Sequence, residues 1–279
     1  MKKLIFNGCS FMAGDELVWE KYQKEHGSKF RPWHRKESYY DGDDALFRFE
    51  YRKYRKQFNL PAIVSRKLGC EWDDLSDDGR SNTNITLETI AYLNDYSKEE
   101  RQKFHVIIGW TCISRILKYS PSQKHFLNLT AQHYSEHTED PAKEELKEHI
   151  KIQILGGDDQ DFILDYVRNV MLLENYLISN NITYTFYRAL DDGLYKFKNI
   201  GPFDYDATLT LNVEACTNHN NWYPFSGAPI APIYEYGWNM VFFNKPNLVI
   251  SEENKHPGFS AINAFSTKLS DFVQKQNVL

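Results

Sequence analysis

Apolar and polar positions follow two different periods along this chain, and the pattern predicts strands separated by helices. Short runs of apolar, β-branched and aromatic residues predict five strands, at residues 4–7, 71–76, 104–110, 182–187 and 248–250. Apolar residues at helical spacing predict four helices, at residues 61–68, 84–96, 161–179 and 260–274. Strands that alternate with helices favour a parallel sheet covered by helices on both faces.

Three long segments do not fit this alternation, at about residues 16–59, 118–158 and 190–246. The first is polar and aromatic, the second is charged and predicted to be helical in part, and the third is rich in aromatic residues. Segments of this length are uncommon unless they cover or form a binding site. No internal repeat or flexible linker divides the chain, so we expect a single domain over residues 1–279 that carries these three insertions.

Composition narrows the function classes. A formal net charge of −5 gives no support for nucleic-acid binding. Residues 48–56 do interleave cations with aromatic rings, but acidic residues precede them, and we predict an amphipathic helix with a solvated charged face.

The sequence also predicts the cellular location and the redox state of the cysteines. No apolar run approaches the length of a membrane span, and the apolar start is too short for a signal peptide. Four scattered cysteines predict reduced thiols rather than a disulfide framework or a zinc site. We expect a cytoplasmic protein with no membrane partner.

Candidate chemistry lies at the two ends of the chain. The first predicted strand leads into a turn with one serine, Ser10, in the run Gly-Cys-Ser-Phe at residues 8–11, and Gly14 closes this turn. Near the other end, His256 precedes a proline and follows Glu253 by three residues. A hydroxyl, an imidazole and a carboxylate are the groups that acyl transfer by a serine nucleophile needs. Turns at the carboxyl ends of parallel strands meet at one edge of the sheet, so we expect these residues to come together there.

These runs resemble the sequence blocks of the SGNH (GDSL-type) serine hydrolases. Residues 8–14 are similar to the first block, with Cys9 in place of the usual Asp, and residues 78–82 are similar to the second. Residues 107–111 stand where the third block, Gly-x-Asn-Asp, would fall, and residues 253–257 resemble the fifth block, Asp-x-x-His-Pro. The Gly-Cys-Ser-Phe and Gly-Trp-Thr variants are similar to a subset of the family found in tailed-phage genomes. The resemblance implies a flavodoxin-like three-layer αβα sandwich with a five-stranded parallel sheet.

The resemblance also implies roles for individual residues. Ser10 would be the nucleophile and His256 the base that takes its proton. The backbone N–H groups of Ser10 and Gly79 would form part of the oxyanion hole. The family's third donor is an Asn side chain, whose place is taken here by Thr111. Asn82 is an alternative donor, and its other interpretation is a cap for the helix that follows.

Other candidates each have two interpretations. Glu253 is either the acid that orients His256, where the family has Asp, or a solvent-facing charge. Trp110 either walls the pocket or packs in the core, and Arg115 either binds an acidic group of the substrate or lies on a surface helix. His133 and His137, four residues apart, lack an evident third ligand, and we therefore predict no metal site.

Together these observations predict a serine esterase that needs no metal or organic cofactor. The substrate class that we expect is an O-acyl ester, such as an O-acetyl group, on a polar carrier such as a carbohydrate or a nucleoside. Two alternatives remain: a catalytically degraded SGNH-like fold that acts as a binding or assembly module, and an acyltransferase that uses the same serine. His219 is the alternative base, and the oligomeric state is left open.

Overall fold

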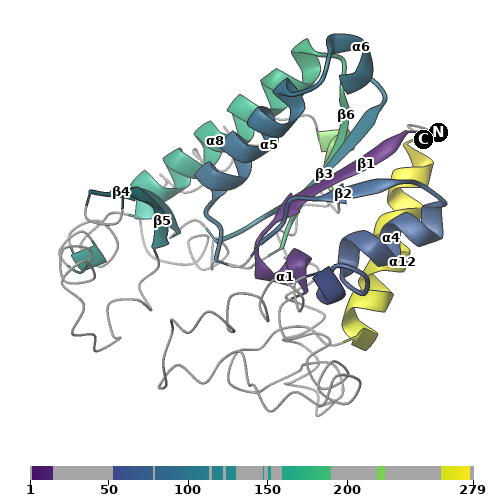
Figure 1. Cartoon of the computed structure of the whole chain (residues 1–279), viewed down its shortest axis with the longest axis horizontal. Helices are drawn as coiled ribbons and strands as arrows, with labels where there is room; N and C mark the ends of the chain where they lie inside the picture. Colours follow the sequence, from purple (N-terminus) through teal and green to yellow (C-terminus); the bar gives the residue numbers. More distant parts are fainter. Residues whose placement is uncertain are drawn as a thin grey trace, which may run out of the picture.

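In the computed structural model, a parallel sheet lies between two layers of helices (Figure 1). The structure describes residues 2–14, 53–77, 79–112, 115–121, 124–129, 147, 150–151, 159–189, 219–223 and 259–276. The sheet consists of β1 (Lys3–Gly8), β2 (Trp72–Asp74), β3 (Phe104–Trp110) and β6 (Thr183–Arg188). These are four of the five predicted strands, and the fifth, at residues 248–250, falls outside the described residues.

Strand order fits the predicted flavodoxin-like topology. The strands lie in the order β2-β1-β3-β6 and all neighbours are parallel, which matches the first four places of the flavodoxin-like order. At the outer edge of β6, Trp222 forms a parallel bridge with Phe186, and the Tyr223 N–H donates to the Phe186 carbonyl at 2.8 Å. The segment that contains the short helix η3 (His219–Asn221) therefore borders the sheet on this side.

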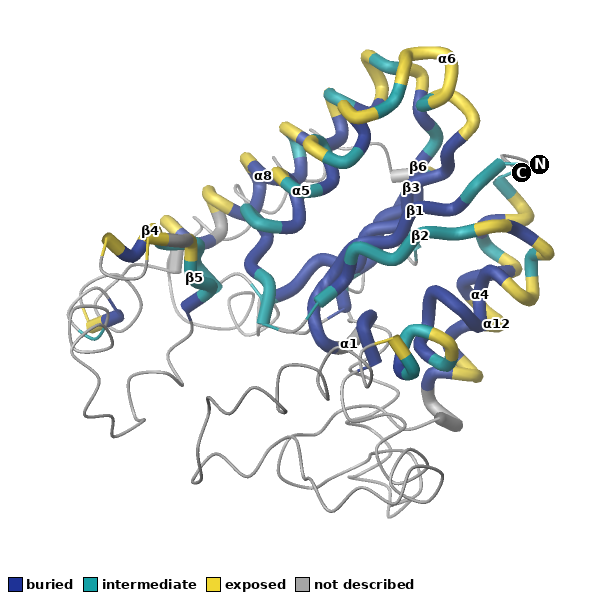
Figure 2. The backbone as a smooth tube through the Cα atoms, viewed as in Figure 1, coloured by how far each residue is buried: buried dark blue, intermediate teal, exposed yellow. Residues whose placement is uncertain are grey.

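The strands are buried between the two helical layers (Figure 2), and their side chains divide the core into two clusters. Side chains on one face pack with α4 (Leu60–Leu68) and α12 (Phe259–Lys275), and the strand residues among them are Leu4, Phe6, Ile107 and Tyr187. Side chains on the other face pack with α5 (Asn82–Asn94) and α8 (Asp159–Ser179), and their residues from the sheet are Ile5, Phe104, Val106, Ile108, Trp110, Tyr184 and Phe186. This period of two is the pattern that a sheet buried on both faces requires.

The four predicted helices are confirmed, with boundaries shifted by one or two residues. Local capping explains where two of them begin. The Asn59 side chain accepts the Ala62 N–H at 3.2 Å before α4, and the Ser81 hydroxyl accepts the Asn84 N–H at 3.2 Å before α5. None of the helices among the described residues is both long enough and apolar enough to span a membrane.

One element was missed by the sequence analysis. Strands β4 (Ile116–Ser120) and β5 (His125–Leu129) form an antiparallel hairpin. The sequence analysis predicts a charged and partly helical segment from about residue 118. Ile116, Leu127 and Leu129 from this hairpin pack against the α5/α8 side of the core. The strand signal is short, with five residues in each strand, and Lys118 and Asn128 interrupt the apolar residues. A four-residue helix, α6 (Lys98–Arg101), precedes β3.

Helix α12 runs antiparallel to the strands. Near its end, Gln276 accepts a hydrogen bond of 2.7 Å from the Thr185 hydroxyl, and Phe265, further toward its start, packs on Tyr187 at 5.2 Å between ring centroids. Later residues of β6 therefore lie beside earlier residues of α12. The start of α12 consequently lies toward the carboxyl edge of the sheet, as the yellow helix in Figure 1 shows.

Two glycines at the carboxyl ends of β1 and β3 leave room for the side chains of Met12 and Tyr187. Gly8 and Gly109 are partners in the ladder between these strands. A Cβ atom on Gly8 would lie 3.0 Å from the Gly109 carbonyl oxygen, and one on Gly109 would lie 2.7 Å from the Tyr187 Oη and 3.1 Å from the Met12 Cε. Only glycine leaves room for both side chains at this point.

We predict that Gly109→Ala lowers the free energy of unfolding by about 1–3 kcal/mol, because the added methyl group overpacks a fully buried contact. Urea denaturation measures the loss. Tyr187→Phe is the control, and it should be close to neutral because the buried Tyr187 hydroxyl has no hydrogen-bond partner among the described residues. The double variant should recover only part of the loss, since the Tyr187 Cζ would still lie 2.9 Å from the new methyl group. A neutral Gly109→Ala would contradict the close fit.

Candidate active site

Ser10 is the first residue of α1 (Ser10–Ala13), a single turn that follows β1 directly. Cys9 has extended backbone angles, and Gly14 ends the turn in the left-handed region at φ 72°, where its N–H donates to the Ser10 carbonyl at 2.9 Å. Only 5% of the Ser10 surface is exposed. The prediction of a strand followed by a turn that starts with a serine is confirmed, and Ser10 is buried in this turn.

Cys9 stands where the resembling family has Asp. Its side chain is fully buried and belongs to the core between the sheet and the α4/α12 layer, together with Leu4, Phe6 and Met12. Cys9, Cys70 and Cys112 form no disulfide among the described residues. A small apolar side chain suits this position, so Cys9 contributes packing beneath the turn rather than a second nucleophile.

The ends of β1 and β3 are level with each other. Because Gly8 pairs with Gly109, Ser10 and Thr111 each come two residues after a matched position on adjacent strands. Adjacent parallel strands lie about 4.8 Å apart, so both residues leave the sheet at the same edge. The register therefore brings the first and third sequence blocks together.

The second block joins them through the turn after β2. The Asp77 N–H donates to the Gly8 carbonyl at 3.2 Å, and Gly79 follows two residues later. Gly79 has φ 71°, a left-handed conformation that disfavours a Cβ atom although the space around it is open. Gly79 thus has a backbone reason to be glycine, and its turn lies at the edge where β1 and β3 end.

Asn82 binds the backbone beyond β3. Its Oδ1 accepts the Thr111 N–H at 2.9 Å, and its Nδ2 donates to the carbonyls of Thr111 and Cys112 at 3.2 and 3.3 Å. The side chain is buried and its polar atoms are occupied. In contrast, the Thr111 Oγ1 is buried with no hydrogen-bond partner in the part of the chain that the structure describes. Of the two candidates for the side-chain donor, Thr111 is the one with a hydroxyl still to be satisfied.

Residues from the hairpin hold the second-block turn in place. The Asn128 Oδ1 accepts the Ser81 N–H at 2.8 Å, and the Arg115 Nη1 donates to the Arg80 carbonyl at 3.4 Å. Arg115 directly precedes β4, so its interpretation as part of a surface helix is wrong. The hairpin that the sequence analysis missed therefore supports the predicted oxyanion loop.

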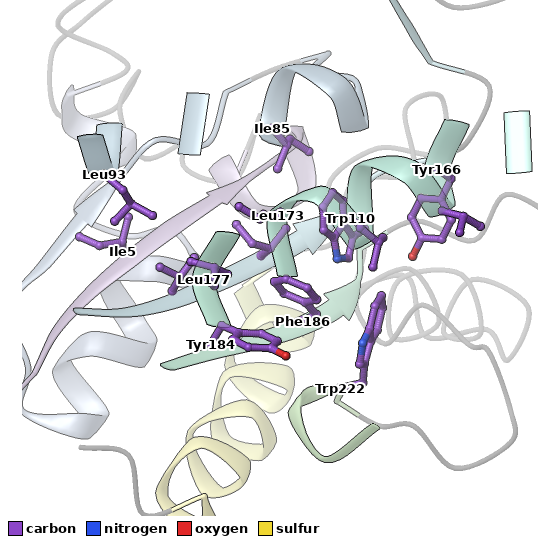
Figure 3. Packing of buried hydrophobic residues seen from close by; sticks show 14 of the residues in the cluster. Ile5, Ile85, Leu93, Trp110, Tyr166, Leu173, Leu177, Tyr184, Phe186 and Trp222 are labelled. Atoms are coloured by element: carbon purple, nitrogen blue, oxygen red, sulfur yellow. The ribbon is translucent and has the colours of Figure 1, made fainter. Parts of the chain in front are cut away.

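Trp110 lies in the core. It is fully buried and packs edge-on against Phe186 and Tyr166, with ring centroids 5.3 and 6.0 Å away (Figure 3). All three rings lie on the α5/α8 side of the sheet. Of the two interpretations for Trp110, the structure supports the position in the core and not the role as pocket wall.

Two polar residues before α4 support the site and were not predicted. Arg55 has only 1% of its side chain exposed and pairs with Asp77 at 3.7 Å, so the prediction of a solvated charged face is wrong at this residue. Because Asp77 also bonds to Gly8, this buried ion pair lies next to the junction of the first two blocks. Nothing in the local sequence distinguishes Arg55 from the other cations of its segment.

Asn59 links three elements at the same edge. Besides capping α4, its Nδ2 donates to the Ala13 carbonyl at 3.3 Å and to the Asp74 Oδ2 at 2.7 Å. Burial raises the pKa of the Asp74 carboxyl above its ordinary value, while the charge of Lys56 and the hydrogen bonds from Ser76 and Asn59 oppose this rise. Asn59 thereby ties the end of α1 to β2. Its partners Ala13 and Asp74 lie far from it in the sequence, so no local pattern points to these bonds.

One histidine among the described residues is fully buried but has a structural role. Nδ1 of His105 lies 3.0 Å from the Thr183 hydroxyl, and its Nε2 lies 3.0 Å from the Thr185 hydroxyl. Burial, helped by the nearby charge of Lys2, lowers the pKa of His105 to about 3, so the ring is neutral at physiological pH. It lies in the first half of β3, away from the carboxyl edge, and is not a candidate base.

The predicted base and acid, His256 and Glu253, lie outside the described residues, as do His133 and His137. The alternative base, His219, is on η3, beside the outer edge of β6. Among the residues that the structure describes, no three His, Cys, Asp or Glu side chains gather in a group that could hold a metal ion.

Comparisons with known proteins find similarity only at the level of structure. The sequence matches no model of a protein family and no curated protein. A psychrotrophic esterase from Pseudoalteromonas sp., in a structure inhibited by monoethylphosphonate, matches with a TM-score of 0.45 and 12% identity over 99% of this chain and 98% of its own.

Two further solved structures are similar to the same degree. One is a carbohydrate esterase described as having divergent catalytic and non-catalytic binding functions, with a TM-score of 0.45, 14% identity and coverage of 98% of this chain and 68% of its own. The other is an acetyl xylan esterase from Butyrivibrio proteoclasticus, with a TM-score of 0.45 and 10% identity over all of this chain but only 65% of its own. Similarity at this level does not identify the reaction or the substrate of this chain.

We predict that Asn82→Ala lowers the free energy of unfolding by about 1–3 kcal/mol, because it removes the buried Asn82 acceptor of the Thr111 N–H. Thermal or urea denaturation measures the change. Asn84→Ala, in the same first turn of α5, is the matched control. The Asn84 side chain makes no hydrogen bond to a described residue, so its replacement by a better helix former should be neutral or slightly stabilising. Equal effects of the two substitutions would show that the Asn82 bonds contribute nothing.

Proposed function

We propose that this chain is a serine hydrolase that cleaves an ester, with Ser10 as the nucleophile and His256 as the general base. The register between β1 and β3 is the observation that carries the proposal, because it takes Ser10 and Thr111 out of the sheet at one edge. The bond from Asp77 to Gly8 brings the Gly79 turn to that edge too. The three turns are the ones that resemble the family's first three blocks.

The direction of α12 supports the role of His256. The helix begins at Phe259, and its start lies toward the carboxyl edge of the sheet. His256 precedes this start by three residues, a stretch of chain that spans at most about 10 Å. In the proposal, His256 reaches Ser10 from this side, and Glu253 orients the imidazole as the Asp of the family does.

The reaction follows from these assignments. The Ser10 Oγ attacks the acyl carbon while His256 accepts the hydroxyl proton, and a tetrahedral intermediate forms. The proton then passes from His256 to the leaving alcohol as the ester bond breaks. Water, activated by the same imidazole, attacks the acyl group on Ser10, and cleavage of this second ester restores the hydroxyl. No step requires a metal or an organic cofactor.

The oxyanion hole in this proposal has two backbone donors and one hydroxyl. The N–H groups of Ser10 and Gly79 face the developing charge, together with the Thr111 Oγ1. Asn82 acts indirectly, because its amide holds the Thr111 backbone. A hydroxyl offers a single proton, whereas an Asn amide offers two, so this hole stabilises the transition state less than that of the resembling family.

The substrate in this proposal is an O-acyl ester, such as an acetyl ester, on a polar carrier such as a carbohydrate or nucleoside. The sequence supports this choice through the aromatic residues of segment 190–246, since sugar and base rings stack on aromatic faces. An acyltransferase would use the same serine and pass the acyl group to an alcohol instead of water. The low exposure of Ser10 favours the third possibility, a binding module that performs no chemistry.

We predict that a small fluorophosphonate probe labels the wild-type protein on Ser10, and that Ser10→Ala abolishes both labelling and p-nitrophenyl acetate hydrolysis. Mass spectrometry of the labelled peptide identifies the modified residue. Ser65→Ala is the matched control, because Ser65 is a fully buried serine on α4 and should leave labelling unchanged. Labelling that survives Ser10→Ala removes Ser10 from the mechanism, and a folded wild type that is never labelled supports the binding module.

We predict that Thr111→Val lowers kcat about 10- to 100-fold while KM changes little, because the lost hydroxyl donates only in the transition state. The same change should leave the free energy of unfolding unchanged or raise it, since the Thr111 Oγ1 has no partner to lose among the described residues. Steady-state kinetics and urea denaturation of the same preparation separate the two effects. Unchanged kcat would exclude Thr111 from the oxyanion hole.

A further inference from the structure

Arg115 is a cation placed beside the proposed oxyanion loop. It follows the end of β3 by five residues, and its backbone N–H donates to the Cys112 carbonyl at 3.4 Å. Its side chain turns toward the neighbouring loop, where the Nη1 donates to the carbonyl of Arg80, the residue after Gly79. The guanidinium thus lies between the Gly79 turn and the chain that leaves β3.

The charge of Arg115 has no carboxylate partner in the part of the chain that the structure describes. The nearby acid Glu88 pairs with Arg80, and the buried Arg55 pairs with Asp77. The single bond from Arg115 to the Arg80 carbonyl, at 3.4 Å, is long, and its Nε is buried with no acceptor among the described residues. A guanidinium has five N–H donors and is always charged, so most of its capacity for binding an anion is unused here.

We propose that Arg115 recognises an oxyanion, a carboxylate or a phosphate, on the alcohol part of the ester, so that the substrate is an acyl ester of an acidic carrier. This inference rests on the proposed function and specifies its substrate class. The planar guanidinium matches both oxyanions through paired N–H···O bonds. Ser10 and Gly79 hold the acyl oxygen, while Arg115, between the Gly79 turn and the chain that leaves β3, binds the carrier.

Matched small esters test the charge preference. The substrates are para-acetoxybenzoate and its neutral isostere para-acetoxybenzamide, with para-acetoxyphenyl phosphate to compare phosphate with carboxylate. The variants are Arg115→Gln, which removes the charge, and Arg115→Lys, which keeps it. Arg101→Gln is the control, because Arg101 bonds to the Tyr96 carbonyl before β3, at the opposite edge of the sheet.

We expect Arg115→Gln to lower kcat/KM for the anionic esters about 10- to 100-fold more than that for the benzamide, whose own loss measures the effect of removing the bond to the Arg80 carbonyl. Arg115→Lys should retain part of the preference, and Arg101→Gln should retain all of it. The larger loss for benzoate or for phosphate identifies the oxyanion. Equal losses on charged and neutral esters would overturn the proposal, because they show that Arg115 only positions the Gly79 turn. No preference for charge in the wild type would overturn it as well.

A binding measurement separates this inference from the proposed reaction. para-Hydroxybenzoate and inorganic phosphate are titrated into wild type, Ser10→Ala and Arg115→Gln, and affinity is measured by calorimetry. Binding that Ser10→Ala retains and Arg115→Gln loses supports the anion site even if no ester is cleaved. If the wild type binds neither anion, or Arg115→Gln binds as well as the wild type, the anion site is excluded, whatever becomes of the esterase.

Discussion

The close approach of β1 and β3 at Gly8 and Gly109 is the constraint on which the rest of the structure depends. The missing side chains leave space that Met12 and Tyr187 fill, so the turn that starts with Ser10 lies directly against the sheet. The same pairing sets the level at which the chain leaves β3 toward Thr111. A side chain at either glycine would force the two strands or the two covering residues apart, and the first and third blocks would lose their alignment.

Most of the sheet and its helices could be predicted because their signals are local. The apolar run of β3 and the helical spacing of α8 are each complete within one segment, and the Asn59 and Ser81 caps precede their helices directly. The hairpin was missed because its strands are short and carry polar residues and exposed rings beside their packed positions. Tyr119 and Phe126, for example, form an exposed cross-strand pair, so their aromatic rings do not mark a buried face of a strand.

The candidate site was only partly predictable, for a different reason. Ser10, Gly79 and Thr111 could be found because each follows a strand within a recognisable short run. The roles of Arg55 and Asn82 depend instead on partners that lie far away in the chain, Asp77 and the backbone at Thr111. A single sequence carries no record of such pairings, so Arg55 was interpreted as a surface charge and Asn82 as one of two possible donors.

In the proposed mechanism, Thr111 takes the place of the Asn of the resembling family, and this difference affects how the proposed site would reach its rate. The structure compensates in part, since the Asn82 amide fixes the Thr111 backbone and spares its hydroxyl from a structural bond. One hydroxyl still provides less stabilisation of an oxyanion than an amide aimed at the same atom. Binding energy from a part of the substrate that does not react can offset this loss when it holds the ester in the attacking geometry. In the proposal, a charged carrier bound at Arg115, which bonds to the residue after Gly79, would supply such energy beside the proposed oxyanion hole.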